Sequence, residues 1–180
     1  FTGVITTAYV DIPDGEWYTQ AVSTATEKGW FAGYEDNTFK PEGTITRCEA
    51  AKVLVTYKYG DHLPQVSPNL YADVNESEWY AVYCNISEAD NIIPSGSNFH
   101  PNAEITRQDA LAGIVKVSGV DYKNADLSLL RQFTDASEIS QENAKYFAAG
   151  IAKKMIHGYP DGTVNPQGTI TRAEFATLML

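Results

Sequence analysis

Ile45-Thr46-Arg47-Cys48-Glu49 is the stretch that decides the fold, because the chain repeats its pattern twice more. The second copy reads Ile105-Thr106-Arg107-Gln108-Asp109, and the third reads Ile170-Thr171-Arg172-Ala173-Glu174. Thr followed three residues later by an acid is a capping box, in which Thr caps the first helical turn and the acid reaches back to the Thr N–H. The sequence therefore predicts three helices that begin at this motif.

The arginine of each motif is unexpected at a helix start. The macrodipole and the unpaired N–H groups are already positive there, so a cation is unfavourable by a few tenths to about 1 kcal/mol. We therefore expect something negative beside Arg47, Arg107 and Arg172. Two interpretations stay open: a carboxylate from a neighbouring copy, or an anionic ligand held by the guanidinium and the free helix N–H groups.

Other motifs recur at similar intervals. The motif arginines lie 60 and 65 residues apart, and an aromatic-x-Asp motif recurs every 62 residues, at residues 9–11, 71–73 and 133–135. A fixed period of this size indicates three copies of one supersecondary unit. We predict copies at residues 1–58, 59–120 and 121–180.

Each copy has the same predicted organisation. An aromatic-x-Asp turn precedes a first helix, expected over residues 16–28 in the first copy, and a turn-rich loop then leads to the motif helix. A two-helix unit is too small to be stable alone, so three copies are expected to share a core. The predicted fold is all-α: three tandem helix-loop-helix repeats in a pseudo-three-fold domain with a central three-helix bundle. Surface linkers are expected at 58–70 and 118–132, with one extra helical turn at 126–130.

The composition excludes several classes of function. The 180 residues carry a net charge of −10, so a nucleic-acid partner is not expected. No run of about 18 apolar residues is present, so we expect no membrane insertion. Cys48 and Cys84 are too few for a structural zinc site, and no His, Cys and Asp residues have the spacing of metal ligands. We therefore expect no metal and no cofactor, and favour buried free thiols over a disulfide.

The ordered set of motifs resembles the S-layer homology (SLH) domain over essentially the whole chain. It consists of aromatic-x-Asp, a Trp-led helix, Gly-Tyr-x-Asp-x-Thr-Phe-x-Pro and Ile-Thr-Arg-x-Glu, in three copies. The resemblance implies a pseudo-trimeric monomer outside the cell, at the cell wall or S-layer, that anchors a secreted protein on the bacterial surface. The implied partner is a secondary cell wall polysaccharide, commonly a pyruvylated amino-sugar glycan. The grooves between copies would bind its terminal sugar, with the motif arginine on the pyruvate carboxylate.

The candidate ligand-binding residues are of three kinds. The cations are Arg47, Arg172 and, in the divergent second copy, Arg107. The acids are Glu49 and Glu174, which we expect to cap helices first, and Asp36 and Asp161, which brace the loop or contact sugar hydroxyls. The aromatic candidates for the apolar sugar faces are Trp17, Trp30, Trp79, Tyr34 and Tyr159.

Several of these assignments compete with structural roles. We expect Trp17 and Trp79 to pack mainly in the core, with one edge at a groove. Asp11, Asp73 and Asp135 are most simply turn or helix-capping residues. The second copy departs from the pattern, because residues 92–99 lack the Gly-Tyr pair and the loop Asp. Glu142 takes the place of the tryptophan in the third copy.

Three functions compete at this point. The favoured one is a non-catalytic carbohydrate-binding anchor. A glycan hydrolase using acids such as Glu49 and Asp36 is disfavoured, because an active site needs one defined constellation and the copies diverge. The alternative that stays open is a structural module that binds proteins or assembles with itself in a surface layer.

Overall fold

The computed structural model describes residues 9–68 and 71–180, and in these ranges the protein is all-α, as predicted. The elements are α1 (Thr19–Glu27), α2 (Arg47–Tyr59), α3 (Ala81–Ala89), α4 (Arg107–Ser118), the short 3₁₀ helices η1 (Leu127–Gln132) and η2 (Ala136–Glu138), α5 (Ala144–Ala152) and α6 (Arg172–Leu178). Among the described residues, no helix is both long and apolar enough to cross a membrane. The extra turn expected at residues 126–130 corresponds to η1.

The three motif helices begin where the capping boxes predict. The hydroxyl oxygens of Thr46, Thr106 and Thr171 accept hydrogen bonds from the backbone N–H three residues later, over 3.4, 3.2 and 3.1 Å. The second half of the predicted box is different. The carboxylates of Glu49 and Glu174 accept from the hydroxyl of their own Thr, which leaves their other oxygens for a different partner.

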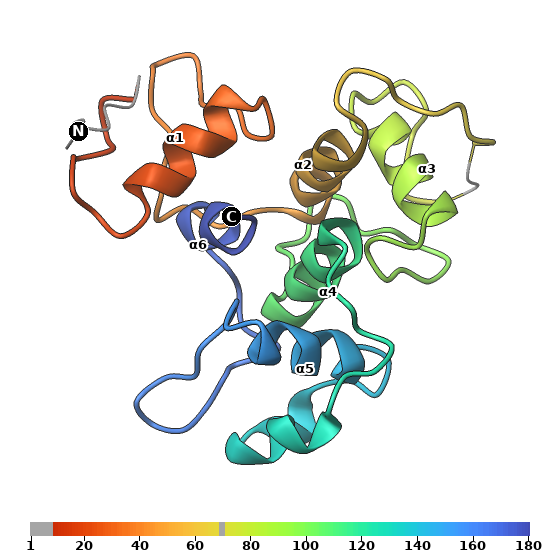
Figure 1. Cartoon of the computed structure of the whole chain (residues 1–180). Helices are drawn as coiled ribbons and strands as arrows, with labels where there is room; N and C mark the ends of the chain where they lie inside the picture. The colour runs from red at the N-terminus through yellow and green to blue at the C-terminus, as the bar shows by residue number, and fades with distance from the viewer. Residues whose placement is uncertain (1–8, 69–70) are drawn as a thin grey trace.

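The helices pack in pairs that join neighbouring copies. The helix α3 lies on α2, α5 lies on α4, and α1 lies on α6 (Figure 1). The first helix of each copy therefore covers the motif helix of the preceding copy, in cyclic order. The motif helices α2, α4 and α6 lie toward the middle, and α4 contacts both of the others (Figure 1). A relation by three-fold symmetry remains a prediction.

Backbone hydrogen bonds connect the starts of the motif helices to one another. The N–H groups of the motif arginines donate to carbonyls of the following copy in cyclic order, with Arg47 to Ala103, Arg107 to Gly168 and Arg172 to Gly43, over 2.8–2.9 Å. The next N–H in each helix donates to the carbonyl of Pro101, Pro166 or Pro41. The first N–H groups of these helices are therefore already occupied by the protein.

Apolar side chains at equivalent helix positions fill the core. Ala50, Ala110 and Phe175, five residues after the motif Ile, are all fully buried. Cys48 and Cys84 are buried free thiols, as predicted. Burial raises the pKa of both thiols, that of Cys84 to about 12.

Candidate functional site

Each motif arginine is buried and forms an ion pair with the motif acid of the following copy. The Nη1 atom of Arg47 lies 3.0 Å from Asp109, that of Arg107 lies 2.5 Å from Glu174, and that of Arg172 lies 3.5 Å from Glu49. The three arginines are only 5–8% exposed. Of the two interpretations of the motif, the carboxylate from a neighbouring copy describes this geometry.

Loop carbonyls hold the remaining faces of the guanidinium groups. Arg172 donates from Nε to the Phe39 carbonyl over 2.8 Å and from Nη2 to the Ala32 carbonyl over 2.9 Å. Arg47 makes the same two contacts with the carbonyls of Phe99 and Pro94. Because the helix N–H groups are also occupied, the expectation that they are free to bind an anion is wrong. An anion near these helices has to be bound by side chains.

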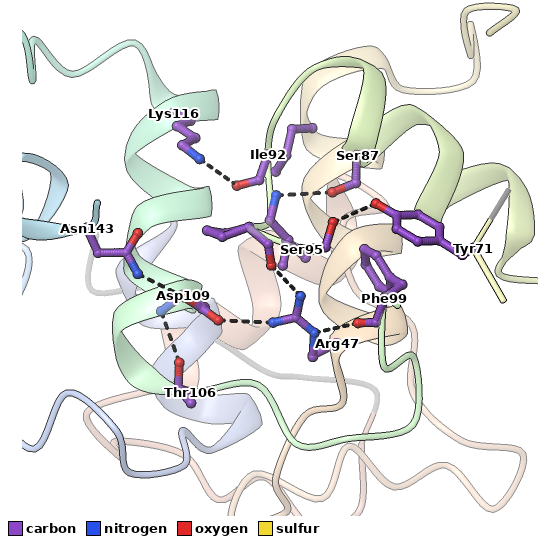
Figure 2. Close-up of polar contacts among 12 residues, drawn as sticks. Arg47, Tyr71, Ser87, Ile92, Ser95, Phe99, Thr106, Asp109, Lys116 and Asn143 are labelled. Carbon is purple, nitrogen blue, oxygen red and sulfur yellow. Dashed lines mark hydrogen bonds and ion pairs between the residues drawn. The ribbon is translucent and has the colours of Figure 1, made fainter. Parts of the chain in front are cut away.

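The guanidinium carbon of Arg47 lies 5.2 Å from the centre of the buried Phe99 ring, but no Trp, Tyr or Phe lines the cleft beside Arg47. Figure 2 shows its guanidinium between Phe99 and Asp109, while the other carboxylate oxygen of Asp109 accepts from Asn143 over 2.9 Å. Beside it is a cleft of about 420 Å³ that Arg47 lines with Pro94, Ser95, Gly96, Ser97, Asn98, His100, Ala103, Glu104 and Thr106. The cation of this cleft is thus matched by the carboxylate of Glu104.

Arg172 lies in a cleft with a different chemical character. Its volume is about 410 Å³, and its lining combines three copies: Trp30, Tyr34 and Glu49 from the first, Trp79 from the second and Arg172 from the third. The guanidinium carbon of Arg172 lies 4.9 Å from the centre of the Tyr34 ring. The structure therefore brings five of the predicted site residues together in one cleft.

Arg107 and its aromatic neighbour form a third arrangement. The Tyr159 ring lies over the guanidinium of Arg107, with 5.2 Å between the ring centre and the guanidinium carbon. Tyr159 and Asp161 also line a cleft of about 820 Å³ together with Asp135 and Glu138. Within the described residues this cleft is lined by three carboxylates and no cation, so its electrostatics disfavour an anionic ligand.

The loop acids brace the loops. Asp36 accepts hydrogen bonds from the hydroxyl and the N–H of Thr38, and the Thr38 hydroxyl above all lowers the pKa of Asp36. Asp161 does the same with Thr163. Of the two roles predicted for these acids, bracing matches the contacts observed.

The Asp of each aromatic-x-Asp motif also holds a loop. Asp73 accepts from two consecutive N–H groups, those of Phe99 and His100, over 3.0 and 2.8 Å, and Asp11 and Asp135 make the matching pairs of bonds. Of the two roles predicted for these residues, the turn role is confirmed, because all three lie in turns, and none of their side chains caps a helix. Burial alone would raise the pKa of Asp73, but the two backbone donors outweigh it and lower the pKa.

The expectation that Trp17 and Trp79 pack mainly in the core is wrong. Their exposed fractions are 60% and 53%, and the buried residue in each pair is the following tyrosine, Tyr18 or Tyr80. Trp79 instead forms one wall of the Arg172 cleft. Lys52 also lines this cleft and was not among the predicted site residues. It is an exposed residue of the motif helix, five residues after Arg47.

Comparison with known proteins identifies the family. The S-layer homology domain model matches residues 8–51 and 132–176, which contain the first and third capping motifs. The chain belongs to the S-layer homology family through these two segments, which confirms the resemblance drawn from the sequence. The second copy, whose loop departs from the pattern, lies outside the matched segments and stays a prediction from its motifs and their spacing.

Three relatives illustrate where such segments occur. A "Cellulosome-anchoring protein" of Acetivibrio thermocellus is 30% identical over 89% of this chain and 36% of its own length. A "Surface-layer 125 kDa protein" of Lysinibacillus sphaericus is 33% identical over 67% of this chain and 12% of its own length. "Exoglucanase XynX" of Acetivibrio thermocellus is 27% identical over 94% of this chain and 16% of its own length. The chain therefore spans only about a third or less of these relatives.

The family assigns the chain to a general role and place. S-layer homology domains are anchoring modules, so the chain is a cell-surface anchoring module associated with the bacterial cell wall. The relatives differ in the activity that their names state, since one is an exoglucanase by name and another a surface-layer protein.

Proposed function

We propose that the chain holds a secreted protein on the cell wall by binding an anionic, pyruvylated secondary cell wall polysaccharide in the Arg172 cleft. The observation that carries this proposal is the composition of that cleft. It places two cations, Arg172 and Lys52, against one carboxylate, Glu49, and surrounds them with aromatic rings. On a chain of net charge −10, this is a local positive site.

The chemistry of the cleft suits the end of such a glycan. A ketal-linked pyruvate carries a permanent carboxylate, which a guanidinium and an ammonium group stabilise by charge-assisted hydrogen bonds. Arg172 uses three of its five N–H donors on Phe39, Ala32 and Glu49, which leaves two for a ligand. The rings of Trp30, Tyr34 and Trp79 offer apolar surface to the faces of the sugar.

We propose further that the chain is not a catalyst. The two acids considered for hydrolysis are committed to other contacts, Asp36 to Thr38 and Glu49 to Thr46 and Arg172. A glycosidase needs two carboxyl groups free to flank the scissile bond. Arg47 and Arg107 stay predictions as ligand contacts, since their surroundings lack either the aromatic wall or the excess of cations.

Calorimetric titration tests the proposal. The probes are a pyruvylated amino-sugar methyl glycoside and the same glycoside without pyruvate. We expect the chain to bind the charged probe and to lose about tenfold or more in affinity on Trp79→Ala, since a sugar face loses its aromatic wall. Trp17→Ala is the matched control, because Trp17 has the same place in its copy but lies outside the lining of this cleft. Absence of heat with the charged probe would overturn the proposal.

A further inference from the structure

Lys52 differs from Arg172, the other cation that lines this cleft, in having no acidic partner. Among the described residues its ammonium group forms no ion pair, and it lies 5.6 Å from the centre of the Trp79 ring. Arg172, by contrast, is 5% exposed and is tied to Glu49 and two loop carbonyls. The exposed lysine is therefore the cation that is free to move toward a ligand.

We infer that Lys52 supplies most of the selectivity of the Arg172 cleft for a negatively charged ligand, beside the two N–H donors that Arg172 leaves free. This inference rests on the proposed function and names the contact that carries its charge selectivity. An ammonium on a flexible stem adapts to an anion at the cleft mouth, and its loss of hydration is offset by the charge-assisted bond. The ammonium group of Lys52 lies 5.6 Å from the centre of the Trp79 ring, so this cation stands beside the aromatic wall of the cleft.

Three other lysines do not fit this role, because none of them lines the cleft. Lys28 lies 5.6 Å from the ring centre of Trp30. Lys40 is 4.2 Å from the ring centre of Tyr34 and is not part of the cleft lining. Lys116 is half-buried and donates to the Ile92 carbonyl over 3.2 Å (Figure 2). Burial lowers the pKa of Lys116 from its ordinary value.

Lys52 also distinguishes the Arg172 cleft from the surroundings of the other two motif arginines, Arg47 and Arg107. Five residues after the motif arginine, the second copy has Ala112, which is fully buried, and the third has Thr177. The structure therefore supplies an uncommitted cation at this helix position only beside Arg172, among the three motif helices. A charged ligand is then expected to prefer one of the three sites, with a stoichiometry near one per chain.

The test compares Lys52→Gln with Lys52→Arg in the whole chain. With the pyruvylated glycoside, we expect Lys52→Gln to bind about tenfold more weakly, the effect of one charge-assisted hydrogen bond, and Lys52→Arg to stay within about threefold of the native chain. With the uncharged parent glycoside, followed by ligand-detected NMR, both variants should bind as the native chain does. Lys123→Ala is the control for the change in net charge, because Lys123 is exposed and lies in the third copy.

Salt dependence gives a second readout that a structural role would not change. Between about 0.02 and 0.5 M NaCl the native chain should lose affinity for the charged glycoside, and Lys52→Gln should lose clearly less, because screening acts on the exposed contact. Native binding together with unchanged affinity in Lys52→Gln would overturn the inference and leave the proposed function standing. An equal loss for charged and uncharged glycosides would also overturn it. If the native chain binds neither glycoside, both proposals fail.

Discussion

Arg172 donates a hydrogen bond from Nη1 to Oε2 of Glu49 over 3.5 Å and so ties the last motif helix to the first. The same end of the chain meets the first copy again where α1 packs on α6 and where the Phe175 ring lies 5.9 Å from that of Phe31. The two ends of the sequence therefore form one helix pair. Loss of packing on α6 should therefore destabilise the first copy, some 150 residues away in the sequence.

Phe175→Ala tests this closure. Phe175 is fully buried, and removal of a buried aromatic ring typically costs about 3–5 kcal/mol of unfolding free energy. We expect a loss of that size in urea denaturation, together with faster amide hydrogen exchange in α1. The equivalent position in the first copy is Ala50, so the ring is a feature of this helix pair alone.

The matched control removes a large buried side chain from a different pair. Leu111 is fully buried in α4, which packs against α5. Leu111→Ala should destabilise the chain by about 2–5 kcal/mol and raise exchange first in α5. If Phe175→Ala leaves the exchange of α1 unchanged relative to Leu111→Ala, the two chain ends are not coupled as described.

A second prediction separates stability from binding at Arg47. Arg47→Met leaves the part-buried Asp109 without its cation, and loss of one partner of a buried ion pair costs about 3 kcal/mol or more. We expect that loss in chemical denaturation. At a temperature where the variant is folded, its affinity for the pyruvylated glycoside should fall less than that of Trp79→Ala. A drop in affinity larger than that of Trp79→Ala would instead make the Arg47 cleft the main site.

A third prediction concerns the glycine of the Gly-Tyr pair. A Cβ atom on Gly33 would come within 2.1 Å of the Tyr9 ring and 2.8 Å of the Thr38 carbonyl, and one on Gly158 within 2.7 Å of Phe133. Gly33→Ala and Gly158→Ala should each lower the unfolding free energy by about 1–3 kcal/mol, because overpacking displaces the aromatic ring. Gly96→Ala is the control, since its Cβ would meet no atom within 4 Å. Equal stability of all three variants would contradict the prediction.

The second copy shows how the pattern tolerates a different residue at this place. Ser95 stands where the glycine is expected, and its hydroxyl lies 2.5 Å from that of Tyr71, the aromatic residue of the same copy (Figure 2). The packing of an aromatic ring on a glycine is thus replaced by a hydrogen bond between two hydroxyl groups. This replacement keeps the aromatic-x-Asp turn against the loop without the Gly-Tyr pair.

Local features of the fold were predictable from the sequence because their causes are local. The Thr caps depend on a spacing of three residues, and the buried positions of the motif helices follow helical periodicity. The exposure of Trp79 was not predictable in this way. It precedes the first residue of α3, Ala81, so helical periodicity does not fix its direction.

The sequence indicates that each motif arginine has a negatively charged partner, but it does not show which acid that partner is. An unfavourable cation at three helix starts indicates a negative partner, but Arg47 and Asp109 are 62 residues apart, and no local pattern pairs them. The cyclic order of the copies determines which acid pairs with which arginine, since each motif arginine forms an ion pair with the motif acid of the next copy. Lys52 was missed for the same reason, because its neighbours Trp79 and Arg172 come from other copies.

A fourth prediction follows from the buried thiols. Burial raises the pKa of Cys48, and that of Cys84 to about 12, so neither is a thiolate near neutral pH. We expect no reaction of the folded chain with iodoacetamide at pH 7.5 over hours, and reaction of two thiols per chain in about 6 M guanidinium chloride. Rapid labelling of the native chain would show that α2 or α3 opens locally.

The last prediction concerns acid stability. The carboxylates that hold the loops, those of Asp36, Asp73 and Asp161, have a folded-state pKa below the ordinary value of 3.8. A group of this kind binds a proton more readily in the unfolded chain, so its contribution to stability is present above the unfolded pKa and is lost as the pH falls through the folded pKa. The unfolding free energy should therefore change little from pH 7 to 5 on account of these groups and decrease below about pH 4.

Asp73→Asn shows whether the loop carboxylates cause this decrease. The variant loses the charge that accepts from the N–H groups of Phe99 and His100, so we expect about 1–2 kcal/mol less stability at pH 7. The difference from the native chain should shrink toward pH 3, because the native Asp73 is then increasingly protonated. Asp61→Asn is the control, because Asp61 is exposed and carries the same charge. A difference between Asp73→Asn and the native chain that stays constant from pH 7 to 3 would mean that the carboxylate acts through its shape and not through its charge.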